Sequence, residues 1–306
     1  MISDAELSQA LATLRTPRDC LRWAETTMRR HDSFLGHGTD DYWDEGLLLL
    51  LHVLSLPWET DPRVLDARLL PLEVEQFADL LRRRVNERIP AAYLVGKAWF
   101  CGFEFIVDER VLIPRSPIAE LIEQRFEPWL VADDVSRVLD LCTGSGCIAI
   151  SCAAVFPEAL VDASDISADA LAVCQQNIEA HGVEQQVTAL LGDGLEAVQG
   201  RYDLIVCNPP YVDAADMASL PAEYRHEPVL ALASGHDGLD FTRRLLKGAA
   251  EHLTEQGILV VEVGNSQAAV ELSWPDIPFV WLTFEHGGEG VFLLTREQLE
   301  KYREQF

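Results

Sequence analysis

Apolar residues recur at helical spacing in the first part of the chain, from Asp4 to about Arg88, with breaks at prolines and glycines. This pattern predicts a small domain of short helices. Its richest apolar run, residues 46–56, is too short to span a bilayer and predicts a buried helix. A basic cluster, residues 82–84 with Arg88, fits either a docking patch or a solvated helix face. The second interpretation is favoured because charge runs usually face water.

Residues 97–101 and 103–107 are aromatic and β-branched runs separated by Gly102. They predict a β-hairpin that joins the two halves of the chain. Ser116 and Pro117 then suit the N-cap and first position of a helix. We therefore expect a helical domain over 1–90, a hairpin linker over 91–115 and a larger domain over 116–306.

From Val135 onward the pattern changes to short apolar runs that alternate with helical segments. Such alternation predicts an α/β domain built on a parallel sheet. A glycine-rich turn at 287–290 predicts that two further strands follow each other at the end of the chain. The seven expected strands are 138–141, 160–164, 187–191, 204–207, 258–263, 279–282 and 291–294.

The chain carries 50 acidic and 24 basic residues, a net charge of −26. This field repels a phosphate backbone, so no direct reading of nucleic acid is expected. It would attract a basic protein, although solubility alone explains such acidity equally well. With 48% hydrophobic and 24% charged residues, the composition is typical of a globular protein.

Seven cysteines occur without a C-x-x-C pair or nearby histidines at metal-ligand spacing. The sequence therefore indicates neither a disulfide framework nor a metal site. The first residues lack the basic start and apolar stretch of a signal peptide. We expect a cytoplasmic protein with no membrane role.

The first chemical signal is the run 138–147, in which a strand enters a loop of small residues and then a helix. Small residues let the backbone approach a ligand at the helix N-terminus. Gly144, Gly146 and Ala149 alone also fit a nicotinamide dinucleotide site or a purely structural turn.

Two acids follow at the ends of the next strands. Asp165 is placed where a carboxylate accepts hydrogen bonds from both hydroxyls of a ribose, although a role as a helix cap fits as well. Asp193 stands where it would reach the exocyclic amine of an adenine, and a solvent-facing turn is the alternative. Both are candidate cofactor-binding residues.

The most specific signal is Asn208, Pro209, Pro210 and Tyr211, which directly follow a buried strand. Two prolines remove two backbone donors and stiffen the loop, so its carbonyls point outward. The side-chain oxygen of Asn208 and the carbonyl of Pro209 are suited to accept the N–H groups of a planar amide or amine, and Tyr211 offers a flat face.

Methyl transfer to such a nitrogen needs orientation and preorganised dipoles rather than a strong base, because the methylated nitrogen loses its proton readily. His226 and Glu227 follow the tetrad and are candidates to line the site. Polar loop residues, however, usually face water.

With these motifs, residues 91–294 resemble the Rossmann-like class I methyltransferases that modify glutamine side chains of proteins. The resemblance rests on the tetrad, on the loop at 140–146, and on 227–228, 231–232 and 235–239. It implies an S-adenosylmethionine-dependent enzyme that methylates the N5 amide nitrogen of glutamine, with a helical N-terminal domain for substrate recognition.

The resemblance also implies roles for individual residues. The tetrad would hold the glutamine amide, with Asn208, Pro209 and Tyr211 as catalytic residues. The cofactor would contact Asp165, Asp193, Asn208 and the loop residues Cys142, Thr143, Gly144, Ser145 and Gly146. Cys142 departs from the glycine that many members have.

Within the family, residues 112–120 resemble the branch that methylates large-subunit ribosomal protein L-three. The release-factor branch usually reads Arg-Pro-x-Thr-Glu after Ile-Pro, a pattern that this chain lacks. Release factor is the first alternative substrate, and an adenine amino-methyltransferase is the second, because adenine N6 is also a planar conjugated amine. A third hypothesis, a nicotinamide dinucleotide oxidoreductase or a non-catalytic nucleotide-binding protein, leaves the tetrad unexplained.

Overall fold

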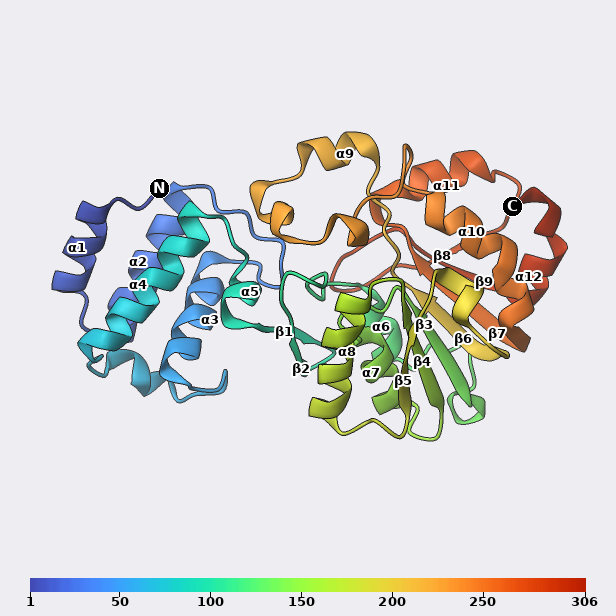
Figure 1. Ribbon diagram of the computed structural model, residues 1–306, viewed down its shortest axis with the longest axis horizontal. Helices are drawn as coiled ribbons and strands as arrows, with labels where there is room; N and C mark the ends of the chain where they lie inside the picture. The colour runs from blue at the N-terminus through green and yellow to red at the C-terminus, as the bar shows by residue number, and fades with distance from the viewer. The chain divides into compact units, whose positions relative to one another are not determined.

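The computed structural model describes all 306 residues, which group into two compact units. The first unit contains Met1–Lys97 and a short later segment, Pro221–His226. The second contains Ala98–Leu220 and Glu227–Phe306. Figure 1 traces both along the chain.

The first unit is helical, as the apolar spacing predicted. Side-chain oxygens of Ser3, Thr16 and Asp41 accept the hydrogen bonds that start three of its helices. The run 46–56 forms most of α3, where Leu49 and Leu50 are fully buried. The helices are α1 (Asp4–Thr13), α2 (Pro17–Arg30), α3 (Tyr42–Leu54), α4 (Pro71–Asn86) and α5 (Ala91–Val95), with 3-10 turns at Pro62–Asp66 and Ala222–His226.

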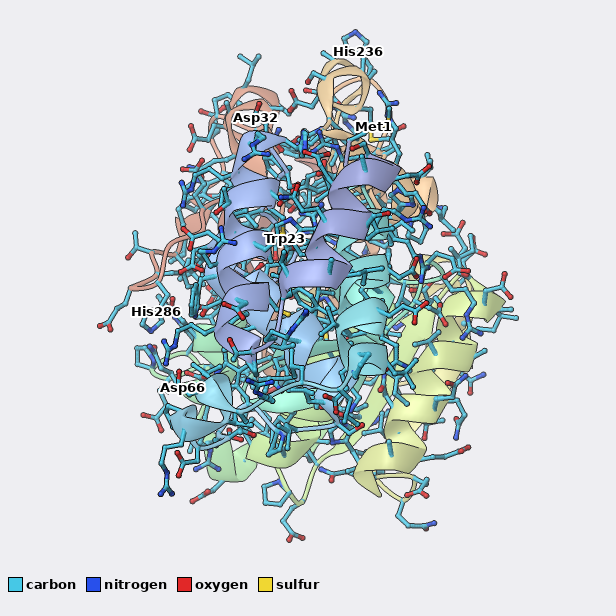
Figure 2. The ribbon with its side chains drawn as sticks, turned by 90° about the vertical axis from the view of Figure 1, so that its left-hand side faces the viewer. Met1, Trp23, Asp32, Asp66, His236 and His286 are labelled. Atoms are coloured by element: carbon cyan, nitrogen blue, oxygen red, sulfur yellow. The ribbon has the colours of Figure 1, made fainter.

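The core of this unit lies between α2, α3 and α4, which contribute fully buried side chains such as Leu21, Leu49 and Phe77. Figure 2 looks onto these helices and shows Trp23 near the centre of the view. The Trp23 ring contacts that of Phe77, with centroids 6.5 Å apart.

The interpretation of 82–84 as a solvated helix face is wrong for Arg84, whose side chain is completely buried. Its guanidinium lies 3.1 Å from Glu45 and 3.2 Å from Glu223, and it donates to the carbonyl of Phe34. Burial of a charge requires such partners. Sequence spacing gave no sign of them, because Glu223 comes from the separate segment Pro221–His226.

The second unit is built on a seven-stranded sheet with the order β5-β4-β3-β6-β7-β9-β8. The first five of these strands are parallel, and β9 runs antiparallel to both of its neighbours. Each of the seven predicted strands is present; β7 begins five residues earlier than predicted, and the other strand ends differ by at most two residues. The strands are β3 (Arg137–Leu141), β4 (Leu160–Asp165), β5 (Val187–Leu191), β6 (Tyr202–Cys207), β7 (Leu253–Glu262), β8 (Val280–Trp281) and β9 (Val291–Thr295).

Helices cover both faces of this sheet (Figure 1). One apolar core contains side chains of α6 (Ile118–Glu123), α7 (Cys147–Val155) and α8 (Ala168–His181). The other contains side chains of α10 (Asp240–Gly248), α11 (Gln267–Ser273) and α12 (Arg296–Lys301). The short α9 (Ala214–Ser219) has no buried residue. This three-layer α/β architecture is the predicted Rossmann-like fold.

The expected hairpin forms a separate sheet of β1 (Lys97–Phe100) and β2 (Phe103–Ile106). Cys101 and Gly102 make the turn with φ values of +48° and +75°. Helix α5 occupies the start of the stretch 91–115 that was expected to be only a hairpin linker. None of the helices is both long and apolar enough to cross a membrane.

Helix α6 begins at Ile118, one residue later than predicted. The Ser116 hydroxyl still accepts a hydrogen bond from the Ile118 backbone, at 3.2 Å. The serine therefore helps to start the helix as expected. Its hydroxyl also donates to Glu262, a contact that the sequence did not indicate.

Candidate active site

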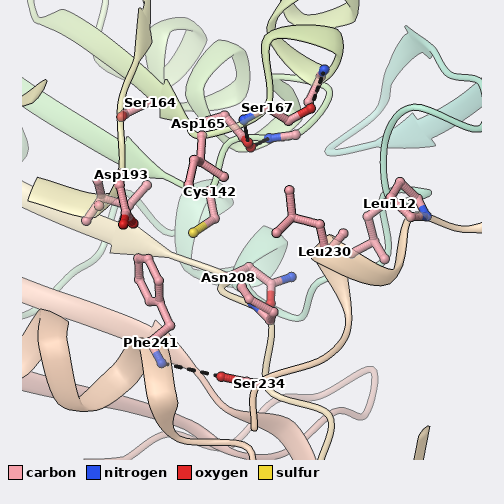
Figure 3. A pocket seen from close by; sticks show the side chains of 18 of the residues that line it. Leu112, Cys142, Ser164, Asp165, Ser167, Asp193, Asn208, Leu230, Ser234 and Phe241 are labelled. Carbon is pink, nitrogen blue, oxygen red and sulfur yellow. Dashed lines mark hydrogen bonds between the residues drawn. The ribbon is translucent and has the colours of Figure 1, made fainter.

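A cavity of about 620 Å³ lies in the second unit at the carboxyl ends of β3, β4, β5 and β6. Strands β4 and β6 flank β3 on opposite sides, so the direction of strand addition reverses here. Ligands of open α/β sheets bind at such a switch point. Figure 3 shows the Cys142, Asp165 and Asn208 side chains around this cavity.

The loop after β3 turns sharply through three residues with positive φ: Cys142 (+60°), Gly144 (+56°) and Gly146 (+82°). A Cβ on Gly146 would stand 2.7 Å from the Cys174 sulfur, so only glycine allows the loop to pack against α8. Cys142 adopts a conformation that glycine adopts more easily. Its side chain nevertheless lines the cavity.

Asp140 is buried beneath this loop and holds it in shape. Its Oδ2 accepts hydrogen bonds from the Thr143 hydroxyl at 2.6 Å and from the Ala149 backbone at 3.1 Å, while Oδ1 has no partner. Burial raises the pKa of Asp140 to about 7, against these two bonds, which lower it. The residue supports the loop from below and does not line the cavity.

Asp165 ends β4 and lines the cavity. One carboxylate oxygen accepts from the Gly144 backbone at 3.0 Å, and the other accepts from Ser167 at 2.9 Å. Burial raises the pKa of Asp165 despite these bonds. Ser167 itself caps α8 through Ala170, so Asp165 is not the helix cap that the sequence left open.

Asp193 lines a more open part of the cavity and is paired with Arg244, whose two terminal nitrogens lie 2.6 and 2.7 Å from the carboxylate. The hydrogen bonds from Arg244 hold the pKa of Asp193 below its ordinary value. The Arg244 guanidinium also lies 5.5 Å from the centre of the Phe241 ring. Phe241 adds a flat apolar wall beside these charges.

The tetrad lies on the loop that leaves β6. Asn208 and Pro210 line the cavity, whereas Pro209 is buried. Tyr211 is not among the lining residues, and its hydroxyl donates to Glu262 at 3.0 Å. Val212 then forms a β-bridge with Ala233, which itself lines the cavity, so the tetrad loop is attached to this later segment.

Glu227 does not face water, contrary to the general expectation for loop residues. Its carboxylate is buried and accepts two hydrogen bonds from the Arg115 guanidinium, at 2.6 and 2.7 Å, and one from the Ile113 backbone at 3.0 Å. The pair therefore joins the segment 113–115 to the chain that follows the tetrad. His226 belongs to the other unit and bonds the Glu87 carbonyl.

Comparison with known proteins identifies the family of this chain. The Methyltransferase small domain model matches residues 126–223. The ribosomal protein uL3 glutamine methyltransferase of Francisella tularensis is 46% identical over 308 residues, with 100% of this chain and 98% of the relative covered. That of Bordetella pertussis is 50% identical over 289 residues, with 94% and 97% covered. The chain belongs to the ribosomal protein uL3 glutamine methyltransferase family.

A solved structure supports the fold alone. The catalytic domain of hMettl16, in complex with MAT2A 3'UTR hairpin 6, aligns with a TM-score of 0.50 at 15% identity, covering 73% of this chain and 80% of that chain. The predicted family and the predicted Rossmann-like methyltransferase fold are thus confirmed.

The cavity brings together six of the eleven residues expected to hold cofactor or substrate. The other five do not line it, and among them Thr143 and Ser145 are buried. The residues at the cavity are Cys142, Gly144, Asp165, Asp193, Asn208 and Pro210; those outside its lining are Thr143, Ser145, Gly146, Pro209 and Tyr211.

Two buried polar residues near the site were missed. Asn177 of α8 bonds both backbone groups of Ile106 in β2 and the carbonyl of Ser145, at 2.7 to 3.0 Å. Glu262 at the end of β7 bonds Tyr211 and Ser116. Neither residue stands out in the sequence, because α8 also carries Gln175, Gln176 and Glu179, and β7 also carries Thr254, Glu255 and Gln256.

Proposed function

We propose that this chain transfers a methyl group from S-adenosylmethionine to the N5 amide nitrogen of a glutamine side chain in ribosomal protein uL3, the L-three protein expected from the sequence. The observation that carries this proposal is that Asn208 of the tetrad lines the same cavity as Gly144 and Asp165. Nitrogen-binding and nucleotide-binding groups therefore share one space. The names of the two full-length relatives support uL3 as the substrate.

The residues of the cavity fit the cofactor. A Cβ on Gly144 would meet no atom within 4 Å, so the loop leaves open space where a ligand can approach the backbone. Each Asp165 oxygen accepts one backbone N–H and retains a lone pair for a ribose hydroxyl. Phe241 and Leu230 offer apolar surface to an adenine.

When bound, S-adenosylmethionine supplies an electrophilic methyl group on a sulfonium. The chain's own residues would bind and orient the acceptor. The Asn208 side-chain oxygen and the Pro209 carbonyl accept the two amide hydrogens of the glutamine. This fixes the nitrogen lone pair toward the cavity and stabilises the positive charge that develops on nitrogen.

Proton removal requires no strong base, because the methylated amide nitrogen is very acidic. The residues that line the cavity include no histidine. Asn208 is suited to its role because an amide oxygen accepts a hydrogen bond without itself being protonated at neutral pH.

The test offers the purified enzyme and labelled S-adenosylmethionine to unmethylated uL3, to release factor and to DNA, separately, and maps labelled residues by peptide mass spectrometry. We expect one glutamine of uL3 to be labelled. Preferential methylation of release factor by about tenfold or more in kcat/KM, roughly 1.4 kcal/mol, would overturn the substrate assignment. Labelling of DNA would revive the adenine alternative.

The variant Asn208→Ala tests whether this side chain holds the substrate amide. We expect a loss of roughly 100-fold in single-turnover methyl transfer, the scale for one preorganised hydrogen-bonding group, with a much smaller change in cofactor affinity. Near-normal transfer by the folded variant would mean that another group holds the amide.

A further inference from the structure

Tyr211 is held from three sides by the end of β7 and the residues after it. Its hydroxyl donates to Glu262 Oε1 at 3.0 Å, and its carbonyl accepts from the Ser266 hydroxyl at 2.8 Å. Its ring lies against Gly264, where a Cβ would stand 2.7 Å from the ring carbon Cε2. The ring, the hydroxyl and the backbone of this residue are therefore all fixed.

The register of the sheet explains why Glu262 reaches the tetrad. Cys207 of β6 pairs with Val261 of β7, so Glu262 stands beside the first tetrad residue, Asn208. The residue is 5% exposed, and its carboxylate receives a second hydrogen bond, from the Ser116 hydroxyl at 2.5 Å. One buried carboxylate thus joins the segment before α6 to the tetrad tyrosine.

Burying the Glu262 carboxylate costs desolvation free energy that a purely structural position does not require. Its two hydrogen-bonding partners are neutral hydroxyls, and the nearby Arg115 guanidinium is bonded to Glu227 instead. Burial raises the pKa of Glu262, against the hydrogen bonds from Ser116 and Tyr211, which lower it. An apolar residue would fill the same space at lower cost.

We propose that Glu262 is a positioning residue for methyl transfer, which holds Tyr211 and through it the loop that presents Asn208 to the cavity, with Ser116 fixing the second carboxylate oxygen. The proposal rests on the proposed function.

The chain supplies a matched control at the opposite end of β6. The Tyr202 hydroxyl donates to Asp162 at 2.6 Å, so Tyr202→Phe deletes the same kind of tyrosine–carboxylate bond. Tyr202 begins the strand that Asn208 follows, about 20 Å away at roughly 3.3 Å per residue. A general loss of stability would affect both variants alike.

The experiment measures kcat and KM for uL3, cofactor affinity by calorimetry, and unfolding for each variant. We expect Tyr211→Phe and Glu262→Ala each to lower kcat/KM for uL3 about tenfold, the scale of one lost hydrogen bond, with cofactor Kd within about twofold. Glu262→Gln, which keeps an acceptor for the hydroxyl, should recover part of the loss. Tyr202→Phe should leave kcat/KM unchanged.

A double-mutant cycle decides whether Glu262 acts through the tyrosine. Adding Glu262→Ala to Tyr211→Phe should cost little beyond Tyr211→Phe alone. Full additivity, or wild-type kcat/KM in Glu262→Gln and Tyr211→Phe, would overturn the inference and leave the proposed function intact. If Glu262→Ala does not fold, Ser116→Ala and Tyr211→Phe provide the test. A wild-type enzyme that binds cofactor but leaves uL3 unmethylated would overturn the proposed function, and this role with it.

Discussion

Removal of the Glu223 carboxylate should strongly lower the free energy of unfolding of the helical unit. Glu223 Oε1 accepts hydrogen bonds from the Phe34 backbone at 2.9 Å and from Arg84 and Arg88 at 3.2 Å each. Burial alone would raise the pKa of Glu223, but the Phe34 N–H and the Arg84 guanidinium outweigh it and hold that pKa below its ordinary value. The carboxylate is therefore charged in the folded protein at neutral pH.

Glu223→Ala would leave Arg84, whose side chain is 0% exposed, with Glu45 as its one remaining carboxylate. Breaking a buried pair on one side costs about 3–5 kcal/mol, because the other charge stays buried. Since Glu45 still compensates in part, we expect a loss near 3 kcal/mol. Glu223→Gln keeps the acceptor oxygen and should lose less.

Hydrogen exchange resolved by peptide measures this effect where it arises, because the two units need not unfold together. Peptides of α4 should lose about 3 kcal/mol of protection, and peptides of β6 and β7 should not change. The control is Glu25→Ala, which breaks the exposed pair of Glu25 with Arg29 and should cost about 0.5 kcal/mol or less. Equal losses in the two variants would refute the assignment of a buried ion cluster.

Three further substitutions test the cavity. Asp165→Ala should weaken S-adenosylmethionine binding roughly 10- to 100-fold in calorimetry, because its carboxylate is proposed to hold the ribose, and an unchanged Kd would exclude that role. Cys142→Gly should relieve about 1 kcal/mol of left-handed strain, partly offset by a more flexible unfolded chain; a clear loss of stability in denaturant unfolding would contradict this. Asp140, with its pKa raised to about 7 from 3.8, binds its proton more tightly in the folded state. Its stabilising contribution is therefore complete below about pH 4 and lost as pH rises through about 7, on the order of 4 kcal/mol. Asp140→Asn should remove this slope, and identical pH profiles of unfolding for the two proteins would show that it does not exist.

The strands of the larger unit could be predicted because each is a short apolar run between polar loops. That signal is local and survives without knowledge of the fold. The position of β9 between β7 and β8 could not be predicted, because the sequence does not state which edges pair. The tetrad and the glycine loop were found for the same local reason, since each is a continuous run of unusual residues.

Residues whose partners are distant in sequence were misjudged or missed. Arg84 looked like part of a solvated basic run, and its partner Glu223 lies 139 residues away. Glu227 looked like an ordinary loop residue, and its partner Arg115 lies 112 residues away. In each case the burial of the charge depends on a pairing that only the three-dimensional fold creates.

Each loop of the site is held by a carboxylate at or near the end of a strand, which accepts hydrogen bonds from loop residues. Asp140 near the end of β3 holds Thr143 and Ala149, and Asp165 at the end of β4 holds Gly144 and Ser167. Glu262 at the end of β7 holds Tyr211 and Ser116 in the same way. The reason is geometric, since parallel strands deliver their loops to one edge of the sheet, where backbone N–H and hydroxyl donors gather and a carboxylate can accept two of them.

Replacing these buried carboxylates by amides should cost less stability than replacing them by alanine. An amide of the same length keeps one acceptor oxygen and removes the cost of burying charge, whereas alanine leaves two donors unsatisfied. Asp140→Asn and Glu262→Gln should therefore retain more stability than the corresponding alanine variants. Asp165 should differ, because it alone of these three acids lines the cavity and is proposed to use its remaining lone pairs for the ligand. Its amide variant keeps only one of the two backbone hydrogen bonds, from Gly144 or Ser167, and should lose cofactor affinity as well.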